Sequence, residues 1–223
     1  MSTVAARVDA ARSRIAAAAR RAGRDPAAVT LVAATKTVPP ARIAEALTAG
    51  VVDVGENRAQ ELVAKAPALA AHQPPPRWHV LGQLQRNKVT ALAPLVWCWH
   101  TIDRAELGAA IARRCPGARV LAEVNLAGEP QKAGCTPEDT LALVDTLRGQ
   151  GLDVVGLMAI PPHGEHPRAF FARLRDLGAA AGVPELSMGM TDDFEVAVEE
   201  GATLVRLGRA LFGDRPQSQA PQQ

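Results

Sequence analysis

The chain has 223 residues, of which 48% are hydrophobic and 22% charged, a balance typical of one folded domain and not of a disordered or membrane-embedded chain. Its 25 basic and 23 acidic residues are spread along the sequence and leave a net charge of +2. This distribution gives no concentrated field for a nucleic acid or an anionic membrane, so neither is an expected partner.

The first predicted element is an N-terminal helix. An apolar stripe at helical spacing, with arginines between its members, ends near Gly23. The stripe consists of Val4, Val8, Ala11, Ile15 and Ala18. Because Met1 to Arg21 lacks the continuous apolar core of a signal peptide, we expect a cytoplasmic protein. The three cysteines fit neither a disulfide framework nor a zinc site, so we expect reduced thiols in or near the core.

Eight short runs rich in valine, leucine and isoleucine follow, and each is predicted to be a strand. They are Thr30–Ala34, Val51–Val54, Trp78–Leu81, Trp97–Ile102, Arg119–Val124, Val154–Met158, Glu185–Met188 and Leu204–Leu207. Segments with helical spacing lie between them. The expected helices are Ala41–Ala49, Ala59–Ala70, a short one after Asn87, Ala105–Arg114, Pro137–Gln150, Pro167–Ala181 and Asp193–Glu200.

The strict alternation of strand and helix predicts an α/β fold with a parallel sheet. Eight strands favour closure into a barrel over an open, doubly wound sheet. We therefore predict a single (β/α)8 TIM-type barrel with an extra N-terminal helix over residues 1–213. A Pro/Gln-rich tail at residues 214–223 is expected to be disordered.

In such barrels the functional site lies at the carboxyl ends of the strands. Lys36 follows the first predicted strand and is one of only four lysines in the chain. An amine that is partly desolvated at a barrel mouth loses its proton more readily than in water and can then form an imine with a carbonyl. The alternatives are an exposed loop lysine or one paired with Glu56.

The segments after strands seven and eight are candidates for phosphate binding, since glycines let the backbone approach an anion closely. Ser187, Gly189 and Thr191 follow strand seven, and Gly208 follows strand eight. The alternative is that Asp192 and Glu195 merely cap the next helix. Arg206, inside an apolar strand, needs an acidic partner or a ligand's phosphate or ring nitrogen. His79 and His100 are expected to be hydrogen-bonded core residues rather than ligands or bases.

Several segments together resemble the pyridoxal 5'-phosphate (PLP) homeostasis proteins. They are Ala33–Lys36, Gly55–Glu61, Trp78–Lys88, Val124–Asn125 with Glu129 and Lys132–Gly134, Gly156–Ile160, Leu186–Asp193, Val205–Gly208 and Leu211–Gly213. The resemblance extends from about residue 5 to 213, in order. The sequence departs from the family at Arg58, where an aromatic residue is common, and at the His163–Pro167 loop. These departures concern the upper edge of the pocket.

The resemblance implies a barrel like the N-terminal domain of alanine racemase, without that enzyme's second, β-rich domain. It implies that Lys36 forms an internal aldimine with PLP. Asn57 and Met158 then match positions beside the ring. The residues that match the phosphate and pyridine end are Ser187, Gly189, Met190, Arg206 and Gly208.

The resemblance also implies a role in vitamin B6 supply, as a cofactor reservoir or carrier without robust catalysis. PLP-dependent apo-enzymes are then candidate partners, and the chain is expected to be a monomer or weak homodimer. A first alternative is a weak amino-acid racemase that uses Cys135, a histidine or water opposite the lysine, since the chain contains no tyrosine. The others are a lysine-dependent aldolase that binds a phosphosugar and a pure interaction protein.

Overall fold

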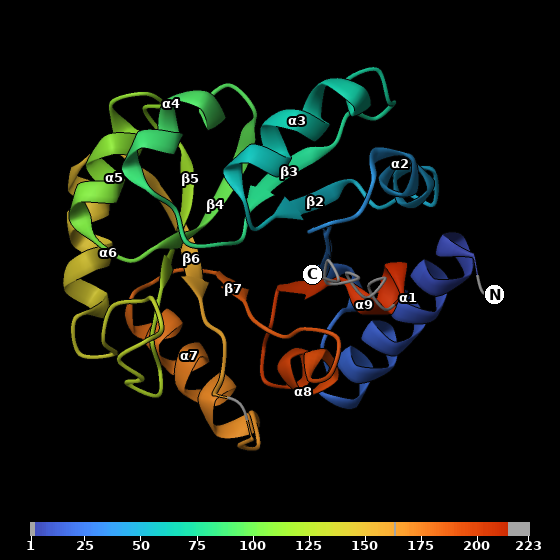
Figure 1. The fold of residues 1–223 in the computed structure, drawn as a ribbon. Coiled ribbons are helices and arrows are strands. Elements are labelled where there is room, and N and C mark those ends of the chain that lie inside the picture. The colour runs from blue at the N-terminus through green and yellow to red at the C-terminus, as the bar shows by residue number, and fades with distance from the viewer. Residues whose placement is uncertain (1–2, 163, 214–223) are drawn as a thin grey trace, which may run out of the picture.

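The computed structural model describes residues 3–162 and 164–213, so the predicted tail at 214–223 lies outside the described residues. Eight parallel strands form a closed barrel in sequence order, in which β8 pairs with β1 (Figure 1). The strands are β1 (Thr30–Ala34), β2 (Asp53–Glu56), β3 (Arg77–Val80), β4 (Val96–Ile102), β5 (Arg119–Glu123), β6 (Asp153–Met158), β7 (Glu185–Ser187) and β8 (Leu204–Leu207). The predicted barrel is confirmed.

Helices connect consecutive strands and surround the barrel (Figure 1). They are α1 (Val4–Arg21), α2 (Pro40–Thr48), α3 (Ala59–Leu69), α4 (Val89–Leu92), α5 (Ala105–Ala112), α6 (Thr140–Gly149), α7 (Arg168–Ala180), α8 (Phe194–Glu199) and α9 (Arg209–Phe212). Two short 3₁₀ segments, Pro26–Ala28 and Arg86–Lys88, lie before β1 and α4. Helix α9 and the two 3₁₀ segments were not predicted. Within the described residues, no helix is long and apolar enough to cross a membrane.

Most predicted boundaries agree with the structure to within two or three residues, and the second strand is shifted most clearly. Val51 and Val52 precede β2, whereas the buried Gly55 and Glu56 lie inside it. An apolar run was expected there. The strand instead carries polar groups that are hydrogen-bonded, Asp53 to His79 on β3 and Glu56 to Lys65 on α3.

The core has two parts. The larger part lies between the barrel and its helices, where the stripe of α1 is buried beside α8 and α9 (Figure 1). The smaller part lies among the strands and consists of Val32, Leu81, Cys98, Leu121, Val155, Met158 and Leu204. Buried polar side chains, His79, His100, Ser187 and Arg206 among them, lie on the strands as well. Polar groups therefore extend through the protein interior toward the carboxyl ends of the strands.

Candidate cofactor site

One cavity of about 560 Å³ lies at the carboxyl ends of β1, β2 and β8, between α2 and α9. Five of the eight residues predicted for the site line it: Lys36, Asn57, Met190, Arg206 and Gly208. The other three, Met158, Ser187 and Gly189, do not line it, and the first two are almost fully buried. The predicted set thus consists of five residues that line the cavity and three that do not. Ser187, one of the three, is hydrogen-bonded to the lining residue Arg206.

Lys36 follows β1 in a turn with an uncommon backbone conformation. Thr37 has a φ of 65°, a left-handed value that is rare for a β-branched residue. Its N–H donates to Glu61 Oε2 at 2.8 Å, and its hydroxyl donates to the Lys36 carbonyl at 2.6 Å. Such strain persists only where surrounding contacts hold it. These contacts fix the backbone that presents the Lys36 amine to the cavity.

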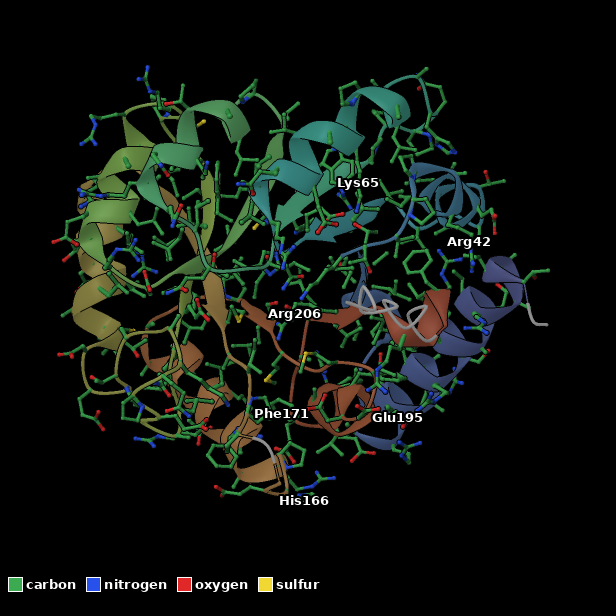
Figure 2. The ribbon with its side chains drawn as sticks, in the orientation of Figure 1. Arg42, Lys65, His166, Phe171, Glu195 and Arg206 are labelled. Carbon is green, nitrogen blue, oxygen red and sulfur yellow. The ribbon has the colours of Figure 1, made fainter. Side chains whose placement is uncertain are left out.

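A network of ion pairs among Lys65, Glu56 and Glu61 holds the Lys36 turn in place. Lys65 Nζ donates to Glu56 Oε1 at 2.7 Å, to Glu61 Oε2 at 2.9 Å and to the Thr35 carbonyl at 2.9 Å. The Thr35 hydroxyl donates to Glu56 Oε1 at 2.6 Å. The suggested pairing of Lys36 with Glu56 is therefore wrong, because Glu56 is paired with Lys65, a buried residue of α3 (Figure 2). No carboxylate among the described residues forms an ion pair with Lys36.

The two carboxylates of this network differ electrostatically. Burial raises the pKa of Glu56 above its usual value, although hydrogen bonds from Lys65 and Thr35 oppose that shift. Burial also acts to raise the pKa of Glu61, but the hydrogen bonds from Lys65 and Thr37 outweigh it and leave this pKa lowered. Lys65 is thus the cation that allows acidic groups to be buried under the Lys36 turn.

Arg206 lies near the centre of the barrel and is 6% exposed (Figure 2). Its guanidinium donates to Ser187 Oγ at 2.7 Å and to the Ala159 carbonyl at 3.1 Å. Both partners are neutral, so the structural ion pair considered as one alternative is absent among the described residues. Burial lowers the pKa of Arg206 to about 10, opposed by the charges of Asp193 and Glu123, and the group stays cationic at neutral pH.

A chain of buried hydrogen bonds continues from Ser187 through the barrel. Ser187 Oγ contacts His100 Nδ1 at 2.9 Å, and His100 Nε2 contacts His79 Nδ1 at 2.8 Å. His79 Nε2 then contacts Asp53 Oδ1 at 2.9 Å. As expected, both histidines are hydrogen-bonded core residues. Burial, with the nearby His79 and Arg206, lowers the pKa of His100 well below its usual value, which makes this ring neutral.

Glu123, at the end of β5, is a further buried acidic group that the sequence did not single out. It is 9% exposed, and its Oε2 has no hydrogen-bonding partner. Burial and the charge of Asp103 raise its pKa to about 7, against the effect of Arg206. The sequence gives no sign that the pKa of a glutamate at the end of an apolar run is shifted. The shift arises from burial and from the charges of Asp103 and Arg206, which are distant in the sequence.

The loop after β7 is shaped by Gly189, whose φ is +91°. A Cβ on this residue would lie 2.6 Å from Ala197 Cβ and 2.9 Å from Phe194 Cα, so only glycine fits against α8. The loop directs Met190 and Thr191 to the cavity. The alternative, a helix cap by Asp192 and Glu195, is not formed, because Asp193 is the N-cap residue of α8 while Asp192 pairs with Arg209 and Glu195 with Arg14.

Other lining residues came from elements that the sequence analysis did not connect to the site. Arg42 on α2 and Arg209 and Phe212 on α9 line the cavity together with Lys36 and Met190. Gly208 is tightly placed, since a Cβ there would lie 3.2 Å from the Ala34 carbonyl oxygen. The contact between the ends of β8 and β1 results from barrel closure, which no local pattern shows.

The cavity residues fit a ligand that carries an aldehyde, an aromatic ring nitrogen and an anionic group. Lys36 offers an amine without an acidic partner, and Arg206 offers a buried cation whose described partners are neutral. Thr191 and Gly208 offer a hydroxyl and a close backbone approach, and Arg209 offers a second cation that is paired with Asp192 on the same cavity wall. The fold and the site together define a (β/α)8-barrel protein with a lysine and an arginine at the carboxyl ends of its strands.

Comparison with known proteins identifies the family. The model of the alanine racemase N-terminal domain matches residues 7–216. The pyridoxal phosphate homeostasis protein of Pseudomonas aeruginosa is 43% identical, with 96% of this chain and 97% of that protein covered. Its counterpart from Aquifex aeolicus is 43% identical, with 91% and 94% covered. The chain belongs to the pyridoxal phosphate homeostasis protein family, within the wider alanine racemase N-terminal domain family, as its sequence predicted.

A solved structure agrees with this assignment. PipY of Synechococcus elongatus PCC7942 with PLP bound superposes with a TM-score of 0.83 at 33% sequence identity. The match covers 95% of this chain and 100% of that one. The barrel is therefore shared over nearly the full length of both chains.

Proposed function

We propose that this protein binds PLP in the cavity at the ends of β1 and β8 and acts as an intracellular reservoir or carrier of the cofactor. The observation that carries the proposal is that Lys36 and Arg206 line one cavity and neither has an acidic partner among the described residues. The relatives' shared name and the PLP bound to PipY support this reading.

Five of the lining residues have a proposed role. The Lys36 nitrogen attacks the aldehyde carbon, and water leaves as a reversible carbon–nitrogen double bond forms. Arg206 would face the ring nitrogen as a fixed cation, while Thr191, Gly208 and Arg209 would hold the phosphate. When bound, PLP supplies an electron-withdrawing ring that stabilises negative charge on an attached carbon.

The composition of the cavity favours holding the cofactor over turnover. A racemase needs a second proton donor on the face opposite the lysine, and no histidine, cysteine or tyrosine is among the described residues that line the cavity. Cys135, the candidate for that role, contacts Thr140 and is half-buried, and burial raises the pKa of its thiol. The three free cysteines agree with a reducing compartment such as the cytosol.

The test is direct. PLP is added to the purified protein, the visible spectrum is recorded, the adduct is reduced with borohydride, and the modified peptide is located by mass spectrometry. We expect a single modified site at Lys36, lost in Lys36→Ala and kept in the matched variant Lys132→Ala. An adduct on Lys65, Lys88 or Lys132, or none at all, would contradict the proposal.

Catalysis is tested separately by deuterium exchange at the α-carbon of alanine with the PLP-loaded protein. We expect exchange no faster than with free PLP at the same concentration. Rapid exchange that Lys36→Ala abolishes would replace the carrier function by a racemase function.

A further inference from the structure

Two grooves lie beside the cofactor cavity, at the carboxyl ends of β2 and β3 and along α4 and α5. The first, of about 360 Å³, includes Asn57, which also lines the cofactor cavity. The second, of about 560 Å³, shares Gln85 with the first and reaches Arg114. The grooves therefore form one continuous surface that begins at the mouth of the cofactor site.

This surface is strongly cationic. Six basic residues line the two grooves, and we call them the α3–α5 face: Arg58, Arg86, Lys88, Arg104, Arg113 and Arg114. No acidic side chain lines either groove in the described part of the chain. Only Arg104 has an ion pair, with Asp103, while the other five have neither an ion pair nor a side-chain hydrogen bond to a described residue.

Several exposed arginines elsewhere in the molecule are paired with glutamates, as in Arg14–Glu195, Arg21–Glu199, Arg168–Glu200 and Arg175–Glu200. Subtracting the six cations of the α3–α5 face from the 25 basic residues leaves 19, against 23 acidic residues in the chain. The even spread of charges along the sequence did not predict this concentration of positive charge, because the fold gathers cations from separate segments while the net charge stays at +2.

We propose that the α3–α5 face docks an acidic protein surface, that of a PLP-dependent apo-enzyme beside its own active site. The inference rests on the proposed function, because docking next to Asn57 matters only if PLP passes through the adjoining mouth. Complementary charge steers two proteins together and fixes their orientation. An apo-enzyme bound there would lie at the opening of the cofactor cavity.

Other polyanions fit the face less well. Single-stranded nucleic acids are held by aromatic side chains on which the bases stack, and no described residue lining either groove is aromatic. Amphipathic helices that lie on a membrane surface combine basic side chains with an exposed apolar face. The exposed large hydrophobic residues, Val63, Trp97, Leu141, Ile160 and Met190, do not line these grooves.

The first experiment uses an N-acetylated poly-L-glutamate peptide as the acidic probe. A carbodiimide joins its carboxylates directly to nearby lysine amines, and Lys88 is the lysine on the α3–α5 face. We expect the cross-link to map to Lys88 and binding to weaken as ionic strength rises above about 0.15 M. Cross-linking to Lys132 in preference to Lys88, or an absence of binding, would overturn the proposal.

Charge reversal provides the matched comparison. The double variant Arg113→Glu/Arg114→Glu should bind the peptide roughly tenfold more weakly or worse. The control is Arg20→Glu on α1. This change reverses the charge of an exposed arginine that lies outside the α3–α5 face and has no described ion pair. An effect of the double variant no larger than that of the control would count against docking. An oligodeoxythymidylate that binds tenfold tighter than the peptide would replace the protein partner by a nucleic acid.

The second experiment measures PLP transfer from the loaded protein to apo-aspartate aminotransferase. We expect transfer faster than spontaneous release into buffer, and we expect Arg113→Glu/Arg114→Glu to remove that excess while its visible PLP spectrum stays normal. Transfer at the rate of spontaneous release would contradict docking and leave PLP binding intact. If the unaltered protein shows no PLP spectrum but the peptide still cross-links to Lys88, the proposed function fails and the acidic-docking face stands.

Discussion

The two sides of the barrel mouth differ in how their charged side chains are paired and buried. On the β8–β1–β2 side, Lys65, Glu56 and Arg206 are buried and each is hydrogen-bonded, although Glu56 Oε2 has no partner. On the α3–α5 face, five cations are without ion pairs to any described residue. The buried groups cost free energy unless they are paired, whereas the exposed ones cost little. Buried charge here fixes the position of a site, and exposed unpaired charge is available to an outside partner.

The largest expected effect comes from removing the central cation of the buried side. Lys65→Met leaves the buried Glu56 without its partner and releases the Thr35 carbonyl. Breaking a buried pair on one side costs about 3–5 kcal/mol, so urea unfolding should show a loss of this size. Lys132→Met, which removes a half-exposed pair with Glu129, is the control. A loss no greater than that of the control would show that the network does not support the Lys36 turn.

The second prediction concerns pH and Glu123. Since burial raises its pKa in the folded state from 4.5 to about 7, the unfolded chain loses this proton at lower pH than the folded one. The free energy of unfolding should therefore fall as pH rises from 4.5 to 7, by about 3 kcal/mol, and stay lower above that. Urea unfolding across this range measures the slope. Glu123→Gln should remove it, and an unchanged slope in this variant would assign the pH dependence to another group.

A smaller effect is expected from Ser187→Ala. This change removes the hydroxyl shared by Arg206 and His100, both buried, and leaves their polar atoms unsatisfied. Such a loss costs about 1–3 kcal/mol, and Arg206 is also freed to move, so PLP affinity should fall with the stability. Thr48→Ala on the surface of α2 is the control, with a change within about 0.5 kcal/mol. Unchanged PLP affinity would show that the buried chain of hydrogen bonds does not influence the cofactor site.

The sequence predicted the fold well because each strand and helix carries its own local signal. Strands β1 and β8 have the predicted bounds, Thr30–Ala34 and Leu204–Leu207. The miss at β2 arose because Asp53, Gly55 and Glu56 are polar or small and yet buried. Apolar periodicity cannot identify a strand whose buried polar groups are hydrogen-bonded by residues distant in the sequence.

The site was predictable only in part, for the same reason. The positions of Lys36, Asn57 and Arg206 after or within strands suggested that they meet at the mouth, and all three line the cavity. The hydrogen-bonded chain from Asp53 through His79 and His100 to Ser187 involves four different strands. Which side chains contact one another depends on how the barrel closes and on the stagger of its strands. Neither property can be predicted from a single segment of the sequence.

The smallest expected effect tests the exposed side of the comparison. Arg113→Gln/Arg114→Gln removes two adjacent cations that have no described ion pair, so the fold loses no favourable contact and some like-charge repulsion is relieved. We expect the free energy of unfolding to change by less than about 0.5 kcal/mol, measured by urea unfolding at low and high salt. A loss above about 1 kcal/mol would make these arginines structural. Unchanged stability would show that the fold does not need these cations, which agrees with their proposed role in docking an acidic partner.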